Sequence, residues 1–497
     1  MKQKSASFLL LFSLFLLFPV VPVFAATPIS GDKVATVTAN AGDALVADGN
    51  LSVTISGNSP NADRLLYAKD GGTMTFEGYK TDLKVDVTLT RDGSSGPIGI
   101  EADGQGTEIR IDDGSLYLKA SYNNQWNGAP NNITGIVARN NARVIYSGDV
   151  TLVNDYQKVS GRYALPGAAV RVIDGGYFEM SGDIVVSGAG TGHGIYVKGD
   201  SSTVYMFGNI TTNGSNTNHA LKTEGGDSSI YMVGNISSGA GCGFQGGGKL
   251  FLSGDIETAG QWAYGIHATQ VSSDITYIGN ITTVGSSSSG VVLGNETKGT
   301  AKADITGNIS ATGEGSDGVS LSSNTFNESG FFKMVGNIEG HTRGLGVRGY
   351  TAEVIGNITQ LGDYIPGSLL PAALYMEGKE SKATVVGDVK ALGKDAAGIR
   401  MEAGTIDVFG NVRTLGSGTA HGIRASEGEI VVNLYNGRLD VAAGNADAWH
   451  MLLERGRRAT HAPVVNLTGV TAGADGNLNL LKTESSANVN ANASTLY

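Results

Sequence analysis

A right-handed parallel β-helix is the fold that this sequence predicts, and three observations predict it. A phrase of an apolar or aromatic residue, Gly, Asn or Asp, and Ile or Val, with looser copies, recurs eleven times between Gly148 and Gly410, about every 26 residues. A second phrase, Gly or Ala followed by alternating apolar residues, recurs alongside it. Glycine accounts for 74 of 497 residues and proline for only 10. Repeats of roughly 20–50 residues are typical of solenoids, whose units bury their apolar faces against their neighbours.

Each repeat is expected to contain three short strands. The Gly-Asx phrase opens into one strand, and the second phrase, as in Gly194-Ile195-Tyr196-Val197, forms another. Its apolar residues at every second position indicate a strand with one buried face. Residues 202–206 then lead into the next Gly-Asx. Because each phrase occurs once per repeat, stacked parallel coils are favoured over hairpins, and the chain length predicts about 15–18 coils.

The Gly-Asx residues are assigned a structural role at one corner of the coil. Asn tolerates the left-handed backbone of a tight bend, and stacked Asn amides can bond from coil to coil. The preceding glycine allows the bend or a close backbone approach. The assigned turn residues are Gly208, Asn209, Gly234, Asn235, Gly279, Asn280, Gly307, Asn308, Gly336, Asn337, Gly356, Asn357, Gly387, Asp388, Gly410 and Asn411.

The chain is predicted to divide into four parts. Residues 1–26 are expected to be a cleaved signal peptide, with Lys2 and Lys4 before an apolar run and a small-residue cleavage site near Ala25. Residues 27–134 are assigned to an N-terminal cap and irregular coils, residues 135–482 to regular coils, and residues 483–497 to a polar tail.

Composition excludes several classes of partner. The chain carries 46 acidic and 35 basic residues, a net charge of −11, without basic blocks. Nucleic acid and anionic membrane surfaces are therefore not expected as partners. One cysteine, Cys242, cannot form an intrachain disulfide, so an exported chain of this size must be held together by its core.

A Gly- and Asn-rich, cysteine-poor, exported chain with these phrases resembles the passenger domain of bacterial autotransporters, the pertactin-like surface proteins. The resemblance covers about residues 130–480. It implies a surface or secreted location, a scaffold or adhesin role, and contact with a host-surface protein or glycan. Such proteins carry a C-terminal membrane barrel, and residues 483–497 do not resemble one. The barrel is then encoded separately or lost, or export uses another route.

Two sets of side chains are candidates for binding. His193 and His219 occupy the same slot of neighbouring repeats and are expected to stack about one strand spacing apart. Elsewhere this slot holds unlike residues such as Tyr264 and Asp317, which favours an exposed turn over a metal site. Arg400, Arg424 and His450 are expected to point outward in successive coils, as a basic ridge for an acidic glycan or protein or as solvated side chains. No metal-ligating residue is assigned.

The alternative function is a polysaccharide-active β-helix enzyme, either a lyase or a glycoside hydrolase. Such an enzyme needs acids and bases that converge on one face of the rod. Asp112, Asp113, Asp317, Asp395 and Asp407 are expected on different faces or corners. No catalytic residue and no cofactor is therefore assigned. Ligand specificity is expected in the loops that do not repeat, at residues 122–130, 156–166 and 363–371.

Overall fold

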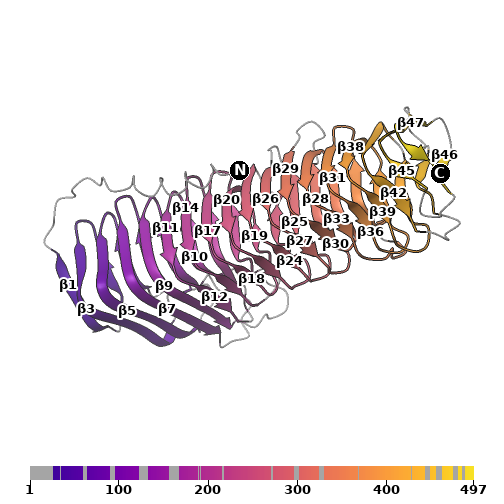
Figure 1. Cartoon of the computed structure of the whole chain (residues 1–497). Coiled ribbons are helices and arrows are strands. Elements are labelled where there is room, and N and C mark those ends of the chain that lie inside the picture. Colours follow the sequence, from indigo (N-terminus) through magenta and orange to yellow (C-terminus); the bar gives the residue numbers. More distant parts are fainter. Residues whose placement is uncertain are drawn as a thin grey trace.

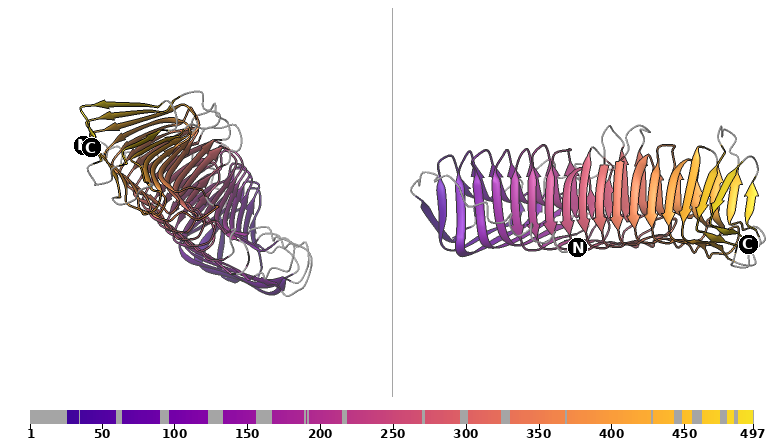
Figure 2. Two further views of the ribbon diagram at one scale, coloured as in Figure 1. Left: turned by 90° about the vertical axis from the view of Figure 1, so that its right-hand side faces the viewer. Right: turned by 45° about the horizontal axis from the view of Figure 1, so that its top comes forward.

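The computed structural model describes residues 26–33, 35–59, 64–89, 96–122, 133–155, 167–188, 190, 192–214, 218–269, 272–295, 301–323, 330–367, 369–426, 428–442, 448–454, 462–473, 479–483 and 487–496. Within these residues the chain forms 48 strands and no helix. The strands stack into one elongated rod with the chain rising coil by coil (Figures 1 and 2). The predicted signal peptide (residues 1–25), and the loops at 123–130 and 156–166, lie outside the described residues.

Three ladders of parallel strands run along the rod. Ladder I contains the strand that precedes the Gly-Asx corner. Its strands are β1 (Thr27–Lys33), β3 (Ala44–Ser59), β5 (Thr73–Leu89), β7 (Glu108–Tyr122), β9 (Arg143–Asp155), β11 (Tyr177–Ser181), β14 (Thr203–Phe207), β17 (Ser229–Val233), β20 (Gly248–Ser253), β23 (Ser273–Ile278), β26 (Ala301–Thr306), β29 (Gly330–Val335), β32 (Tyr350–Ile355), β35 (Lys382–Val386), β38 (Gly404–Phe409), β41 (Ile430–Tyr435), β44 (Val464–Thr468) and β47 (Asn488–Asn492).

Ladder II contains the short strand that follows the corner, and it joins ladder I in one 31-stranded sheet of the described chain. Its strands are β12 (Ile184–Ser187), β15 (Ile210–Thr212), β18 (Ile236–Ser238), β21 (Ile256–Thr258), β24 (Ile281–Thr283), β27 (Ile309–Ala311), β30 (Ile338–Gly340), β33 (Ile358–Gln360), β36 (Val389–Ala391), β39 (Val412–Thr414), β42 (Arg438–Val441), β45 (Thr471–Ala472) and β48 (Thr495–Leu496).

Ladder III contains the second phrase. Its strands are β2 (Val37–Ala39), β4 (Arg64–Lys69), β6 (Ile98–Asp103), β8 (Thr134–Arg139), β10 (Gly167–Ile173), β13 (Gly192–Lys198), β16 (Leu221–Glu224), β19 (Phe244–Gln245), β22 (Ile266–Ala268), β25 (Val291–Asn295), β28 (Asp317–Ser323), β31 (Arg343–Arg348), β34 (Ala372–Glu377), β37 (Ala397–Met401), β40 (His421–Ser426), β43 (Met451–Glu454) and β46 (Leu481–Thr483).

One coil passes through the three ladders in turn. The chain runs along β13 in ladder III, β14 in ladder I and β15 in ladder II, and returns to ladder III in β16. Each strand pairs in parallel with its copy in the next coil, as β14 does with β17 and β15 with β18. The predicted parallel β-helix with three strands per coil is therefore confirmed, because every ladder advances by one coil at each step.

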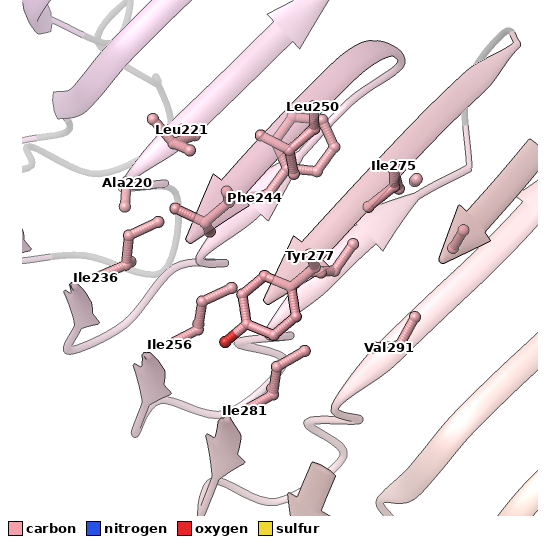
Figure 3. Packing of buried hydrophobic residues seen from close by; sticks show 14 of the residues in the cluster. Ala220, Leu221, Ile236, Phe244, Leu250, Ile256, Ile275, Tyr277, Ile281 and Val291 are labelled. Atoms are coloured by element: carbon pink, nitrogen blue, oxygen red, sulfur yellow. The ribbon is translucent and has the colours of Figure 1, made fainter. Parts of the chain in front are cut away.

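The core lies inside the triangle of ladders. Ile210, Ile236, Ile256 and Ile281 are the first residues of successive ladder II strands, and all are buried. Figure 3 shows Ile236, Ile256 and Ile281 in a row, with Leu221 and Phe244 of ladder III nearby. A column of like apolar side chains removes each coil's inner face from water only when the next coil is present. This is why the repeat, rather than a local motif, specifies the fold.

The N-terminal coils share the ladders but turn the corner differently. β3, β5 and β7 have 16, 17 and 15 residues, and each runs through the corner without ending. Their pairing register shifts at that point, between Val46 and Leu51 in β3 and between Phe76 and Lys80 in β5. Extra residues in one strand produce such bulges. Residues 27–134 therefore hold coils whose corner is a bulge rather than Gly-Asx.

The segment assigned to a polar tail also contains strands. β47 pairs with β44, and β48 pairs with β45, so ladders I and II continue into residues 488–496. The tail is polar because most side chains of this last coil are exposed. Asn490 nonetheless donates from Nδ2 to Oδ1 of Asn466 at 2.8 Å, which extends a side-chain ladder along the outer surface.

Candidate functional site

The Gly-Asx corner is shaped by its glycines. The eight assigned turn glycines, from Gly208 to Gly410, have φ between 140° and 159°, a region that side chains with a Cβ disfavour. A Cβ on Gly336 would also approach the carbonyl oxygen of Gly307 in the preceding coil to less than 3.0 Å. The assigned Asn and Asp residues do not have positive φ. The expectation that Asn supplies the left-handed bend is therefore wrong, because glycine does.

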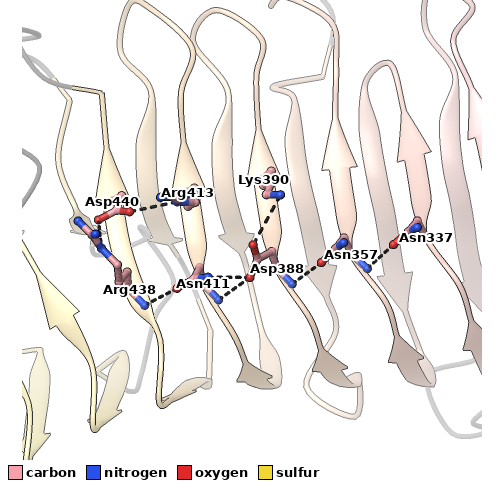
Figure 4. A network of polar contacts seen from close by, with 8 residues as sticks. All are labelled: Asn337, Asn357, Asp388, Lys390, Asn411, Arg413, Arg438 and Asp440. Carbon is pink, nitrogen blue, oxygen red and sulfur yellow. Dashed lines mark hydrogen bonds and ion pairs between the residues drawn. The ribbon is translucent and has the colours of Figure 1, made fainter.

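The Asn and Asp side chains instead link successive coils through their oxygens. The backbone N–H of Asn337 donates to Oδ1 of Asn308, and that of Asn357 to Oδ1 of Asn337, both at 3.0 Å. The series continues through Asp388 and Asn411 (Figure 4). Amide-to-amide bonds from Nδ2 to Oδ1 occur as well, at 3.2 Å from Asn337 to Asn308. Each oxygen pairs a backbone N–H at the bend, so the corner is structural and offers no reactive group.

The first residue of the phrase points outward along the corner, and its apolar copies form a stripe that Ser253 and Thr306 interrupt. These apolar side chains are 39–52% exposed, and each is the last residue of its ladder I strand. The stripe contains Phe207, Val233, Ile278, Val335, Ile355, Val386 and Phe409. Phe409 stacks on Tyr435 of the next coil with ring centroids 4.6 Å apart. Sequence reasoning recorded these residues as part of the repeat but did not identify them as a surface.

The outer face of ladder III carries a column of aromatic and charged side chains. The middle residue of the second phrase points outward and pairs from coil to coil, as Tyr196 does with Arg171 and Lys222. The Arg171 guanidinium carbon lies 5.3 Å from the Tyr196 ring centroid, and Lys222 Nζ lies 6.0 Å from it. Tyr196 donates its O–H to Glu224 at 2.7 Å. A tyrosine is thus held between two cations and fixed by an acid.

The same arrangement recurs towards the C-terminus. The Tyr375 ring lies between Arg343, at 5.2 Å, and Arg400, at 5.4 Å. Arg343 is in turn paired with the buried carboxylate of Asp317, with Nε to Oδ1 at 3.0 Å and Nη2 to Oδ2 at 2.5 Å. Such a two-point pair fixes the guanidinium plane. The outer face of ladder III therefore presents rigid tyrosines rather than freely rotating ones.

An acid–base cluster lies on the N-terminal coils of the same face. Glu101 is buried, with its Oε2 paired to Arg64 and its Oε1 2.8 Å from Arg139 Nη2. Asp103 accepts from Arg139 at 2.6 Å and from Asn140 at 2.6 Å. All four carboxylate oxygens are paired, whereas the buried Nε of Arg139 has no hydrogen-bond partner among the described residues. Sequence reasoning missed Glu101, although Gly99-Ile100-Glu101-Ala102 fits the second phrase and places it in the outward column.

The five aspartates considered for catalysis do not form one site. Asp317 pairs with Arg343 on ladder III, whereas Asp407 lies in ladder I, where its Oδ1 accepts from Asn433 at 2.7 Å. Asp395 follows ladder II, and Asp112 and Asp113 lie in β7. They are thus dispersed, whereas the acid–base cluster uses two residues that were not among the candidates.

The histidine slot is buried, so the expectation of an exposed turn is wrong. His193 is 1% exposed and His219 is 8% exposed. Their rings stack with centroids 5.3 Å apart, as the shared slot predicts. Each Nδ1 accepts the backbone N–H of the next coil, at 3.3 Å from His219 to His193 and at 3.0 Å from Cys242 to His219. Burial, and then the charges of Lys222 and His267, lower the pKa of His219 to about 3.

A small, shallow hollow lies near the C-terminal end of the ladder III face. Its polar lining consists of Asp395, Arg400, Thr419, His421 and Arg424. Arg400 pairs in register with Arg424, as expected for the basic ridge. His450 does not belong to this ridge. The residue in register with Arg424 is Leu452, and His450 is 0% exposed, with its Nδ1 3.1 Å from the carbonyl oxygen of Asn479.

The described residues contain no group of three or more His, Cys, Asp or Glu side chains placed to hold a metal ion. In the same part of the chain, no helix is long and apolar enough to cross a membrane. No family model matches the chain, and no curated protein and no solved structure matches it significantly.

Proposed function

We propose that this chain is an exported scaffold or adhesin that binds an extended partner along the outer face of ladder III. The observation that carries the proposal is the repeated tyrosine between two cations, at Tyr196 and at Tyr375. Aromatic and arginine side chains dominate recognition surfaces because they bring a large contact area at a small entropic cost. A rigid rod presents them in one line, which suits a long ligand better than a small one.

The resemblance to autotransporter passenger domains supports the setting of this function. A parallel β-helix with one apolar core and no described helix is the architecture that the resemblance implies. The proposed location is a bacterial cell surface, the outer membrane or the extracellular space, with a host-surface protein or glycan as partner. The experiment is to identify the N-terminus of the mature protein, which is expected at Ala26 or Thr27.

The alternative, a polysaccharide lyase or glycoside hydrolase, is favoured by one observation. Two acids and two arginines converge at Glu101, Asp103, Arg64 and Arg139. General acid–base catalysis needs a carboxyl group that can reach the substrate and exchange a proton with it. Here all four carboxylate oxygens are bonded within the cluster, and Glu101 is 1% exposed. The geometry therefore supports the binding function better than the enzymatic one.

The binding function is tested by comparing two faces of the same rod. The purified mature chain, fluorescently labelled, is incubated with host cells and with arrays of surface glycans. The double variant Tyr196→Ser with Lys222→Ser is expected to lose at least tenfold in binding. The matched control, Tyr205→Ser with Tyr231→Ser, removes two stacked tyrosines of ladder I and is expected to bind normally. Equal loss in both variants, or loss in neither, contradicts the proposal.

The enzymatic alternative has its own measurement. Incubation of the mature chain with pectin-like and host polysaccharides is expected to release no reducing ends and no unsaturated products. If the parent chain degrades a polysaccharide and Glu101→Gln does not, the protein is an enzyme and the scaffold proposal is wrong.

A further inference from the structure

We propose that the hollow beside His421 binds the carboxylate of an acidic sugar in a polysaccharide, held by Arg424 and His421. This inference rests on the proposed binding function and names the ligand chemistry at one point of the ladder III face. The hollow is shallow and has space for little more than one small group, far less than the roughly 300–1,000 Å³ of drug-sized ligand pockets. It can receive one charged group, while the sugar ring that carries this group lies over the surface beside it.

Arg424 has donors directed at no acceptor of the described chain. Its Nε donates to Oε2 of Glu454 at 3.0 Å, which fixes the guanidinium plane. Neither Nη group bonds to an acceptor within the described residues. A guanidinium held in this way presents two parallel N–H groups, the arrangement that binds a carboxylate at two points. Arg400 stands next to it, oriented by Glu402 at 3.0 Å.

His421 adds a neutral donor. Its Nδ1 accepts the backbone N–H of Trp449 at 3.2 Å, so the ring proton resides on Nε2. Burial, and then the positive charge of Arg424, lower the pKa of His421 to about 4, so the imidazole is uncharged at neutral pH. Nε2–H therefore remains a donor without adding a second charge. The hollow thus offers more donors than the described protein uses, and a ligand rich in acceptors would pair them.

The neighbouring charges favour a sugar over an acidic peptide. Arg400, Arg424 and Lys482 are balanced by Asp395, Glu402 and Glu454, so the region is not a strong basic patch. Oδ1 of Asp395 already accepts the backbone N–H and the hydroxyl of Thr419, which leaves Oδ2 as an acceptor for a hydroxyl donor that a polyglutamate side chain lacks. A sugar places hydroxyl groups beside its carboxylate, and these can donate to Asp395 and pair with Thr419. Leu370 and Pro371 supply an apolar wall for the C–H edge of the ring.

The test measures binding of the mature chain to a panel of acidic saccharides: oligogalacturonate, hyaluronan fragments and sialyllactose. Each is compared with the same saccharide after reduction of its carboxyl groups to alcohols, by isothermal titration calorimetry. At least one acidic saccharide is expected to bind, and its reduced form to bind at least tenfold more weakly. Equal binding of the two forms, or binding of no member, overturns the proposal. Tighter binding of poly-glutamate overturns it in favour of an acidic peptide.

Variants locate the binding. Arg424→Gln is expected to weaken affinity at least tenfold, and Arg424→Lys to restore little because lysine lacks the two-point geometry. His421→Asn keeps an acceptor for the Trp449 N–H and is expected to weaken binding severalfold. The control, Arg413→Gln, removes an arginine that pairs with Asp440 on ladder II and is expected to bind normally. Unchanged affinity in folded Arg424→Gln overturns the proposal.

Failure of this inference is distinguishable from failure of the proposed function. If the Arg424→Gln variant binds host cells normally but the Tyr196→Ser, Lys222→Ser double variant does not, the ladder III face binds its partner without this hollow. If Arg424→Gln does not fold, the carboxyl-reduced saccharides and His421→Asn still decide the question.

Discussion

Asn337 donates two hydrogen bonds to the same oxygen of Asn308, one coil below. Its backbone N–H lies 3.0 Å from Oδ1 of Asn308, and its Nδ2 lies 3.2 Å from that atom. The two residues stand 29 positions apart in the chain. Their contact replaces a sheet bond for the Asn337 N–H, whereas the Asn337 carbonyl oxygen accepts the N–H of Ile309 directly at 2.9 Å. The repeated Asn is therefore an acceptor for its neighbour's backbone.

Removing this acceptor is expected to loosen one corner. Asn308→Ala leaves the exposed Asn337 N–H without a protein partner and should destabilise the rod by about 0.5–1.5 kcal/mol. Asn308→Asp keeps Oδ1, as Asp388 does for Asn411, and should cost less than about 1 kcal/mol. Amide exchange at Asn337 is the direct readout. It should accelerate in Asn308→Ala and stay slow in Asn308→Asp, and slow exchange in both variants would contradict the role of the oxygen.

The corner glycines are expected to be far less replaceable than other glycines with positive φ. Gly336→Ala combines a φ of 140° with a Cβ pressed against the Gly307 carbonyl oxygen, and should cost more than about 3 kcal/mol. Gly367 has a φ of 90° but open space around its Cβ position. Gly367→Ala should cost only about 1 kcal/mol. Denaturation midpoints compare the stability of the two variants. Similar losses of stability would mean that the backbone torsion, and not the contact of the Cβ, sets the cost.

The Asp317–Arg343 pair is expected to be costly to break but replaceable as a unit. The side chains are 8% and 17% exposed, respectively. Arg343→Leu leaves a buried carboxylate uncompensated and should cost about 3–5 kcal/mol. The double variant Asp317→Asn with Arg343→Leu should recover part of that loss because no charge is left unpaired. Thermal unfolding of the two single variants and the double variant gives the coupling free energy between Asp317 and Arg343. Additive losses would show that the residues act independently.

Stability is expected to fall as the pH is lowered through the range of the buried histidines. The pKa of His219 is lowered to about 3 and that of His421 to about 4, so the unfolded chain binds more protons below about pH 6.5. The contribution of these uncharged histidines to the free energy of unfolding is therefore complete above pH 6.5. It decreases as the pH falls from 6.5 towards 4. For His219 the slope should approach about 1.4 kcal/mol per pH unit.

Variant His219→Asn provides the control for this pH dependence. Asn keeps an acceptor for the Cys242 N–H but cannot titrate in this range. Urea denaturation at pH 7.5, 6 and 5 should show a shallower loss for the variant than for the parent chain. Identical slopes would assign the acid sensitivity to other groups.

The ladder register could be predicted only where the repeat is strict. The second phrase placed Arg400 and Arg424 in one outward column, and the structure pairs them. It failed at His450, because the chain between the coils changes length and shifts the register so that Leu452 meets Arg424. A shift of one residue moves a side chain to the opposite face of a strand, and a shift of two moves it along the strand and out of the column.

The sequence by itself determined that coils stack, how many strands each coil contains and which side chains face inward, because burial imposes a period that can be read locally. Only the tertiary structure decided which outward side chains meet. Glu101 contacts Arg64 and Arg139, which are 37 and 38 residues away along the chain, across loops of unequal length. For the same reason, the sequence could not predict that His421, Arg424 and Asp395 line one hollow. Contacts between coils depend on register, and register is set by the whole stack of coils.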